Sequence, residues 1–293
     1  MPFMIVGTVP YEGFPRTLEE CRLTNGKVYL GRESVPMLRG TPALIGAACL
    51  VAEALGLEKP VALVAGDIGR GDGSGQVYDH LVSVLTHGYE GTIVFHYLQP
   101  DVDGHNRVLM KIDDLPSRPL LVADAGYMYV AKMSGFASSY DLFTPDAGEM
   151  AFLADESAPH PFYTRGFLLQ EEERVPELIQ RAYEHENAAR YLLVKGRRDL
   201  TASKDGIIAE IHEPCVPNME PIGGTGDTLT GIVAALIHSG RTIPEAATLG
   251  AEINRVMGCL AQPTPASSIA DLLSFLPKAV QDVLAGRTSQ ETS

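Results

Sequence analysis

The sequence is poor in positive charge. Its 293 residues include 23 lysines and arginines against 37 aspartates and glutamates, which gives a formal net charge of −14. Most of the surface of such a protein would repel a nucleic-acid backbone or an anionic membrane. We therefore expect neither nucleic acid nor a membrane among its partners, whereas a small-molecule substrate can still bind in a locally positive pocket.

Long apolar runs and closely spaced cysteines are also missing. The best apolar stretch, residues 42–57, contains Glu53 and falls short of the ~20 residues that a membrane span needs. The four cysteines show no CxxC spacing, which favours reduced thiols over a disulfide or zinc framework. We expect a cytoplasmic protein without a secretion signal or anchor, and a homo-oligomer.

Two common nucleotide-binding motifs are absent. The glycine-rich loop at residues 66–75 follows an apolar run but does not contain the spacing GxGxxG, and no GxxxxGK[ST] loop occurs there. A dinucleotide-binding fold of the Rossmann type is therefore poorly supported.

Apolar runs alternate with amphipathic segments along the chain. A run such as residues 61–65 is typical of a strand buried on both faces, and alternation with helices indicates βαβ units with a mainly parallel sheet. We expect a hairpin turn at residues 25–26, a polar loop around Asp101, Asp103 and His105, a loop or insertion at 155–175, and a hairpin return at 207–211. Strands are expected at 4–6, 61–65, 93–97, 120–123, 142–143 and 191–194, and helices at 44–55, 76–85, 177–183, 246–260 and 269–280.

A run of small residues near position 224 opens onto an apolar helix. Gly223, Gly224 and Gly226 leave backbone N–H groups free to face an anion, and the N-terminus of the following helix adds to that positive field. Asp227 would repel a phosphate unless it accepts a proton from an attacking hydroxyl, so we interpret it as a general base. The simpler alternative is that Asp227 caps the helix and the glycines form a tight turn.

The segment GGTGDTLTG resembles the Gly-(Ala/Ser/Thr)-Gly-Asp signature of the ribokinase-like superfamily, and most closely its ADP- or ATP-dependent NAD(P)H-hydrate dehydratase branch. The resemblance implies an α/β fold of the ribokinase-like three-layer type, with a mainly parallel central sheet flanked by helices and no separate lid domain. It implies a single domain over residues 1–293, matched at 40–285 and poorly matched at 1–40. Residues Gly223, Gly224, Thr225 and Gly226 would bind the phosphates of ATP or ADP, with Asp227 as the catalytic base.

Acidic residues at expected strand ends extend the resemblance. The segment TPDAGE is similar to the Thr-Pro-His-Pro-Gly-Glu of the dehydratases, and Glu149 would organise Mg²⁺ through water. Asp124 and Asp146 would line the substrate side, because ligands of such sheets bind beyond the carboxyl ends of the strands. Singly, each carboxylate could equally be a helix cap or a solvated loop residue.

Two further segments match the family loosely. Gly69 and Arg70 correspond to the Gly-Pro-Gly-Leu-Gly-Arg loop and would contact substrate, with a surface turn as the alternative. Lys195 and Gly196 correspond to the Leu-Lys-Gly segment beside the nucleotide, with an exposed strand-end lysine as the alternative. The chain departs from the dehydratases at Gly126 and Asp146, both on the expected substrate side.

Three functional hypotheses follow. The first is an ADP- or ATP-dependent NAD(P)H-hydrate dehydratase, and the second is a kinase that phosphorylates a hydroxyl of a sugar or vitamin precursor. These two share every assigned residue, since both need a base, a nucleotide site and Mg²⁺. The third is a non-catalytic nucleotide-binding homologue, against which the retention of Asp227 beside its glycines counts.

Overall fold

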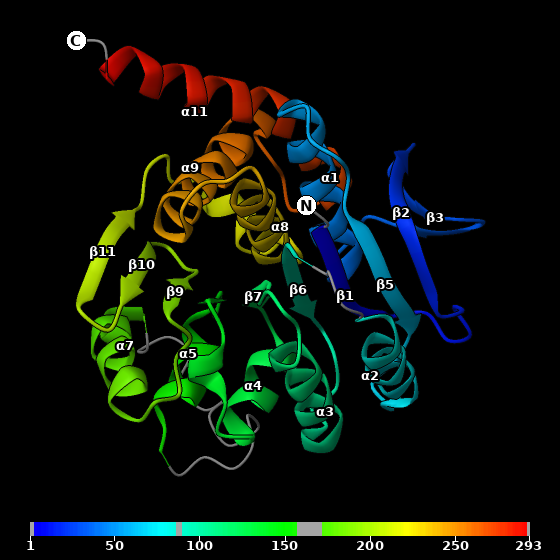
Figure 1. The fold of residues 1–293 in the computed structure, drawn as a ribbon. Helices are drawn as coiled ribbons and strands as arrows, with labels where there is room; N and C mark the ends of the chain where they lie inside the picture. Colours follow the sequence, from blue (N-terminus) through cyan, green and yellow to red (C-terminus); the bar gives the residue numbers. More distant parts are fainter. Residues whose placement is uncertain (1–2, 86–89, 157–171, 292–293) are drawn as a thin grey trace. The chain divides into compact units, whose positions relative to one another are not determined.

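The computed structural model describes residues 3–85, 90–156 and 172–291. It divides into two compact units, each made of two stretches of the chain (Figure 1). The first unit comprises Met1–Thr17 and Leu63–Glu210, and the second comprises Leu18–Ala62 and Ile211–Ser293. Of the loop expected at residues 155–175, residues 157–171 lie outside the described parts. The expectation of a single domain stays a prediction.

The first unit is built on a mainly parallel sheet. Strands β1, β6, β7, β8 and β9 run parallel, with Phe3 opposite Thr92 and Val122 opposite Leu142 in the registers. Strand β10 is antiparallel to β9, and the order of strands is β11-β10-β9-β8-β7-β6-β1-β5. The strands are β1 (Phe3–Val9), β5 (Val61–Gly66), β6 (Thr92–His96), β7 (Leu120–Ala123), β8 (Leu142–Phe143), β9 (Tyr191–Val194), β10 (Asp199–Ser203) and β11 (Gly206–Ile211).

Helices of the first unit lie along one face of this sheet (Figure 1). They bury apolar stripes such as Val77 and Leu81 of α2, because each fully buried aliphatic side chain contributes about 1.5–3 kcal/mol. The helices are α2 (Asp72–Val84), α3 (Val102–Asp113), α4 (Gly126–Met133), α5 (Ala147–Ala154) and α7 (Val175–Glu184). The alternation of strands and helices confirms the α/β class that the sequence predicts.

Two local expectations for the first unit were wrong. The segment expected to be a polar loop is helix α3, because the Asp101 side chain accepts hydrogen bonds from the Asp103 and Gly104 amides and caps the helix. The strand at 191–194 does not return at residues 207–211. Strand β10 returns instead, with Leu200 opposite Val194, and β11 is the next strand outward.

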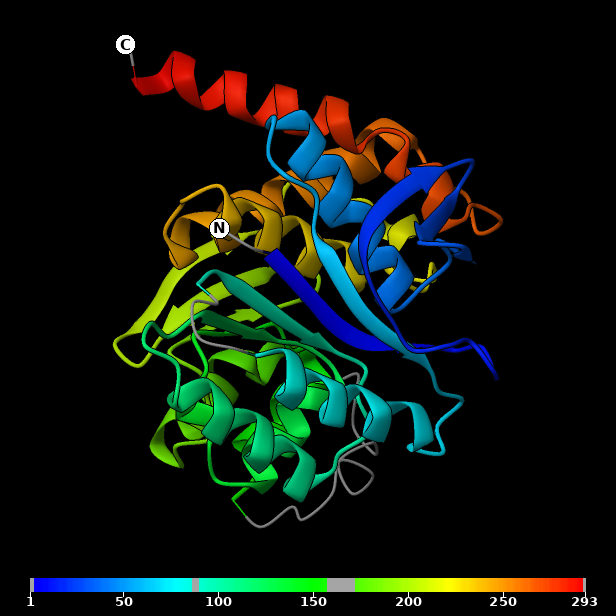
Figure 2. The ribbon, with the colours of Figure 1, turned by 45° about the vertical axis from the view of Figure 1, so that its right-hand side comes forward.

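The second unit combines an antiparallel β-meander with a group of packed helices. Strands β2 (Thr17–Thr24), β3 (Lys27–Leu30) and β4 (Glu33–Pro36) pair in sequence order. The turn between the first two uses Asn25 and Gly26, both with positive φ of 50° and 71°, as the sequence predicts for this dipeptide. The meander lies beside helix α1 (Thr41–Ala54) (Figure 2).

Helix α8 is the centre of the helical group. Helix α1 packs on α8 so closely that a Cβ at Gly231 would collide with the Leu44 carbonyl. On another side, Gly250 of α9 lies directly against Val233. The helices are α8 (Thr225–His238), α9 (Ile243–Ala261), α10 (Ile269–Leu273) and α11 (Leu276–Glu291).

The last predicted helix, residues 269–280, was wrong in one respect. The structure divides it into α10 and α11, and Ser274 and Phe275 separate them. Pro277 lies in the first turn of α11, where its missing N–H costs no hydrogen bond, so the sequence starts a new helix there. Within the described residues no helix has the length and apolar character needed to cross a membrane.

Candidate functional site

Charged side chains of the first unit meet at the carboxyl edge of its parallel strands. Asp124 follows β7, and Lys195 follows β9. The Lys195 Nζ donates to both carboxylate oxygens of Asp124, at 2.8 and 3.0 Å. His96, the last residue of β6, has its Nε2 3.7 Å from Asp124 Oδ2. The structure therefore joins two expected site residues in one ion pair and adds a histidine.

This ion pair is almost removed from water. The side chain of Asp124 is 2% exposed and that of Lys195 is 13% exposed, so the pair keeps little hydration. A buried carboxylate requires such a partner, because an unpaired charge in these surroundings would be strongly destabilising.

The backbone is strained just beyond two of these strand ends. Tyr97, which follows His96, and Ala125, which follows Asp124, both have φ of 51°. A side chain at positive φ costs free energy, and such residues collect at functional sites. The amide of Ala125 also donates to Asp124 Oδ1 at 2.8 Å. The strain thus marks the same edge of the sheet that carries the charges.

Asp146 and Glu149 form a capping box at the start of α5. The Asp146 side chain accepts from the Glu149 amide at 2.7 Å, and Glu149 Oε2 accepts from the Asp146 amide at 2.9 Å. The Tyr129 hydroxyl lies 3.4 Å from Glu149 Oε1. Asp146 therefore does cap a helix, as the simpler interpretation holds. Its role on the substrate side stays a prediction.

Burial and neighbouring charge raise the pKa of Glu149 to about 8. Loss of hydration around its carboxylate is the main cause, repulsion by Asp146 adds to it, and the Lys195 charge opposes it. The Asp124 carboxylate adds further repulsion, so the charges of Asp124, Asp146 and Lys195 all act on Glu149. Such an oxygen-rich, negatively charged set fits Mg²⁺, whose charge would relieve the repulsion.

The glycine-rich loop before α2 is organised by its own aspartate. Asp67 Oδ1 accepts from the amides of Gly69 and Arg70, each at 2.9 Å, and Oδ2 accepts from the Ser74 amide at 2.9 Å. Burial alone would raise the pKa of Asp67, but hydrogen bonds led by those from Ser74 and Gly71 outweigh it and lower the pKa. The carboxylate occupies the place that an anion would take among these amides.

Arg70 and Gly196 are each engaged locally. The Arg70 guanidinium pairs with Glu12 at 3.2 Å on the surface, where such a pair contributes little. The Gly196 amide donates to Asp199 Oδ1 at 3.1 Å. The substrate and nucleotide roles expected for these residues stay predictions.

In the second unit, the glycine-rich segment forms the start of α8. Gly224 is the N-cap, with φ of 110°, and Thr225, Gly226 and Asp227 are the first three helical residues. A Cβ on Gly224 would lie 2.7 Å from Ile269 Cγ1 and 3.1 Å from the Leu38 carbonyl. Both its backbone conformation and its packing therefore require glycine, whereas Gly226 is helical.

The carboxylate of Asp227 is held by a second helix start. The Gly40 amide donates to Asp227 Oδ2 at 2.6 Å, and Gly40 is the N-cap of α1. Asp227 itself lies in the first turn of α8, so its carboxylate lies near the positive ends of two helices. An ionised carboxylate at this place can accept a proton.

A buried polar network fixes the same turn. The Thr225 carbonyl accepts from Thr228 Oγ1 at 2.8 Å and from Asn254 Nδ2 at 3.2 Å. The Thr228 hydroxyl also lies 2.9 Å from Asn254 Oδ1. The bond from the Asn254 amide to the Thr225 carbonyl anchors the first turn of α8 to α9.

Sequence reasoning missed three contributors, namely His96, Gly40 and Asn254. His96 could have been found from its place, because it lies near the end of the expected strand 93–97, and the next expected strand leads to Asp124. Gly40 contributes only a backbone N–H, and Asn254 lies in the middle of a helix, so neither has a signature in sequence.

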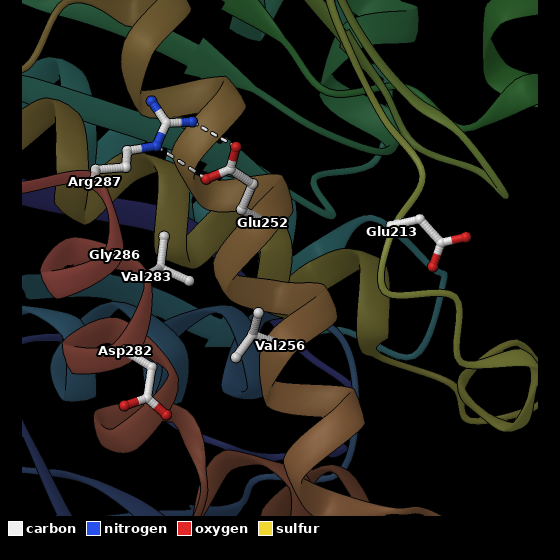
Figure 3. Close-up of a pocket in the computed structure, with 7 residues that line it drawn as sticks. All are labelled: Glu213, Glu252, Val256, Asp282, Val283, Gly286 and Arg287. Atoms are coloured by element: carbon white, nitrogen blue, oxygen red, sulfur yellow. Dashed lines mark hydrogen bonds and ion pairs between the residues drawn. The ribbon is translucent and has the colours of Figure 1, made fainter. Parts of the chain in front are cut away.

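A separate surface pocket of about 560 Å³ lies in the second unit, between α9 and α11 (Figure 3). Arg287 and Glu252 face each other across it and form two hydrogen bonds, at 3.1 and 2.5 Å. Their charges neutralise each other, and none of the residues expected to be functional lines this pocket. Its lining residues are Glu213, Glu252, Val256, Asp282, Val283, Gly286 and Arg287.

Known structures share the fold. Ribokinase from Thermotoga maritima superposes with a TM-score of 0.55 at 12% identity, covering 97% of this chain and 99% of that one. Phosphofructokinase-2 from Escherichia coli, in complex with fructose-6-phosphate, gives a TM-score of 0.52 at 12% identity, covering 96% and 99%. At these identities the likeness concerns the fold alone, which is a ribokinase-like α/β fold with a mixed sheet flanked by helices.

Sequence relatives are more specific. An uncharacterized protein of Methanocaldococcus jannaschii is 41% identical over 229 residues, which are 78% of this chain and 94% of that protein. The ADP-dependent (S)-NAD(P)H-hydrate dehydratase of Cenarchaeum symbiosum is 30% identical over 54% of this chain, and the match spans 50% of that protein. A sequence model of the family described as NAD(P)H-hydrate dehydratase matches residues 106–277, more than half of the chain. The chain therefore belongs to the NAD(P)H-hydrate dehydratase family of carbohydrate-kinase-like proteins.

Proposed function

We propose that this protein is a nucleotide-dependent NAD(P)H-hydrate dehydratase, which returns hydrated NADH or NADPH to the intact coenzyme at the expense of ATP or ADP. The observation that carries the proposal is Asp227, in the first turn of α8 with its carboxylate bonded to the Gly40 amide at 2.6 Å. Membership of the family and a relative described as an ADP-dependent dehydratase support the same reaction.

Asp227 acts as the general base in this proposal. It takes the proton of the hydroxyl on the hydrated ring, and the oxygen then attacks the terminal phosphorus of the nucleotide. The phosphate leaves with its oxygen, the adjacent ring carbon loses a proton, and the carbon–carbon double bond is restored. The dehydration is thus driven by a better leaving group than hydroxide.

The start of α8 binds the phosphates of the nucleotide. The amides of Gly223, Gly224, Thr225 and Gly226 would supply donors, and the positive helix end would favour the negative charge. Lys195 and Gly196 of the first unit are further candidates for nucleotide contacts. The Lys195 ammonium group would then bond to phosphate in place of part of its pairing with Asp124.

Glu149 holds Mg²⁺ through water in this proposal. The negative charges of Asp124 and Asp146, which already act on Glu149, would also attract the ion. Bound Mg²⁺ would neutralise charge on the phosphates. Asp124, Asp146, Gly69 and Arg70 form the proposed substrate side. A cytoplasmic location remains part of the prediction, in keeping with four free cysteines. The homo-oligomeric state remains a prediction as well.

A hydroxyl kinase is the second candidate, and the capping box at α5 favours it. Asp146 stands where dehydratases of the resembling branch carry histidine, and its carboxylate adds to the negative charge that raises the pKa of Glu149 to about 8. Such surroundings suit an uncharged sugar or vitamin precursor better than a group with its own phosphates nearby.

The test is incubation of the purified protein with hydrated NADH and either ATP or ADP, with nucleotide consumption and recovery of NADH absorbance recorded together. A dehydratase consumes nucleotide only with the hydrate and forms NADH. A kinase leaves the hydrate unchanged but consumes nucleotide with a sugar or vitamin precursor. Nucleotide binding without turnover on any of these compounds would reduce the protein to a nucleotide-binding homologue.

A further inference from the structure

The residues just before α1 lie against the glycine-rich start of α8. A Cβ on Gly224 would approach Arg39 Cα at 3.1 Å, and one on Gly223 would lie 3.8 Å from Arg39 Cδ. The side chain of Arg39 therefore runs beside Gly223, and the residue is exposed. With the bond from Gly40 to Asp227, these contacts make Leu38 to Gly40 a second wall of the same site.

This wall changes the charge of the site. The ionised carboxylate of Asp227 would repel a phosphate beside it, and the chain as a whole has a formal net charge of −14. The positive charge of Arg39, whose side chain passes Gly223, offsets that repulsion. Arginine also suits a phosphoryl group, because its planar fork donates two parallel hydrogen bonds to two oxygens.

We propose that Arg39 is the residue that binds the phosphoryl group during its transfer, a role that rests on the proposed function. In that step the bond between the terminal phosphorus and the leaving phosphate oxygen of ATP or ADP breaks. A new bond forms between phosphorus and the substrate hydroxyl oxygen, and the hydroxyl proton goes to Asp227. Arg39 stabilises the negative charge on the oxygens of the transferring group, which is greatest as these bonds exchange.

Two phosphate groups could bind Arg39, namely the transferring group and the pyrophosphate of the substrate. Hydrated NADH carries its own pyrophosphate, and an arginine that bound it would affect mainly the KM of the hydrate. An arginine on the transferring group affects kcat, because its interaction is strongest in the transition state. The two sources of phosphate are therefore distinguished by the kinetic constant that changes.

The test compares Arg39→Ala and Arg39→Lys with the matched control Arg32→Ala, an exposed arginine of the same unit in the turn between β3 and β4. We expect Arg39→Ala to lower kcat by about 10²–10³-fold, the usual loss for one donor to a developing charge. The KM of the hydrate stays within a few-fold, Arg39→Lys recovers part of the loss, and added guanidinium ion partly rescues Arg39→Ala. Arg32→Ala behaves as the wild type.

Each other outcome overturns the role. If Arg39→Ala matches Arg32→Ala while the wild type repairs the hydrate, Arg39 is outside the reaction although the proposed function holds. If only the KM of the hydrate rises, Arg39 binds the substrate's pyrophosphate. If guanidinium ion fails to rescue and Arg39→Lys is as inactive as Arg39→Ala, the loss is structural. A wild type without any repair instead removes the proposed function itself.

Discussion

Asp124 of the first unit and Asp227 of the second are held by different kinds of partner. In the first unit, Asp124 is paired with the Lys195 side chain at 2.8 Å, beside one bond from the Ala125 amide. In the second unit, Asp227 is held by backbone, namely the Gly40 amide and the first turn of its own helix. A lysine side chain is therefore the main partner of Asp124, whereas a main-chain N–H bonds to Asp227.

The difference determines which carboxylate keeps its position when a ligand binds. Backbone amides at two helix starts cannot move without unfolding those turns, so Asp227 keeps its geometry and charge when substrate binds. The Lys195 and Asp124 side chains can exchange partners, and a ligand that carries phosphate or a metal ion competes for them. We expect substitutions in the second unit to affect chemistry and those in the first to affect stability and ion binding.

The largest expected effect concerns the base. Asp227→Asn keeps the shape of the side chain but cannot accept the proton, so turnover should fall by about 10²–10⁴-fold. Asp271→Asn is the control, because Asp271 occupies the same third position of α10 in the same unit. Steady-state kinetics and nucleotide titration together measure the effect. Near-normal turnover of Asp227→Asn, or an equal loss in Asp271→Asn, would sink the assignment.

Breaking the buried ion pair should affect stability next most strongly. Lys195→Met leaves Asp124 without its main partner and should lower the free energy of unfolding by about 3–5 kcal/mol. Lys278→Met, which removes the exposed pair with Asp282 at 2.6 Å, should cost at most about 1 kcal/mol. Urea unfolding measures both. In the double variant, Asp124→Asn should reduce the loss of unfolding free energy that Lys195→Met causes. If it does not, the ion pair is not what stabilises this edge of the sheet.

The third prediction separates strain from packing at the start of α8. Gly224→Val adds a side chain at φ of 110° and collides with Ile269 and the Leu38 carbonyl, whereas Gly240→Val is strained at φ of 93° but meets open space. The strain alone costs about 1–3 kcal/mol in both. Only Gly224→Val should also weaken nucleotide binding, which calorimetric titration detects. Equal nucleotide affinity in the two folded variants would mean that the segment is only a turn.

The last prediction is a pH dependence in the first unit. The folded state raises the pKa of Glu149 from 4.5 to about 8, so it binds a proton that the unfolded chain has lost. The resulting stabilisation is present below pH 4.5 and is lost as the pH rises through about 8. The wild type should therefore lose stability relative to Glu149→Gln across this window, as thermal unfolding at several pH values can measure. Parallel curves for the two proteins would contradict the shift.

Much of the fold could be predicted because it depends on local patterns. Continuous apolar runs identified β5, β6 and β7, and the Asn25-Gly26 dipeptide identified the hairpin turn. Strand β10 was missed because Asp199–Ser203 contains polar residues that are nevertheless buried, including Asp199 and Thr201. Helix α3 was missed because its low apolar content concealed the cap at Asp101.

The candidate site was predicted less completely, for a physical reason. Asp227 and its glycines lie together in sequence, so one motif contains them. The pairing of Asp124 with Lys195 joins residues 71 positions apart, and the bond from Gly40 to Asp227 spans 187. Contacts over such long sequence separations depend on strand order and helix packing. A donor that is only a backbone N–H cannot be recognised from its residue type.

In the proposed reaction, phosphate is transferred to the substrate hydroxyl before that oxygen leaves. The most direct measurement uses hydrated NADH whose ring hydroxyl carries a heavy oxygen isotope, incubated with the protein and ATP or ADP. We expect the heavy oxygen in the inorganic phosphate released, because the oxygen departs bonded to phosphorus. Heavy oxygen in water, with NADH formed and phosphate unlabelled, would contradict it.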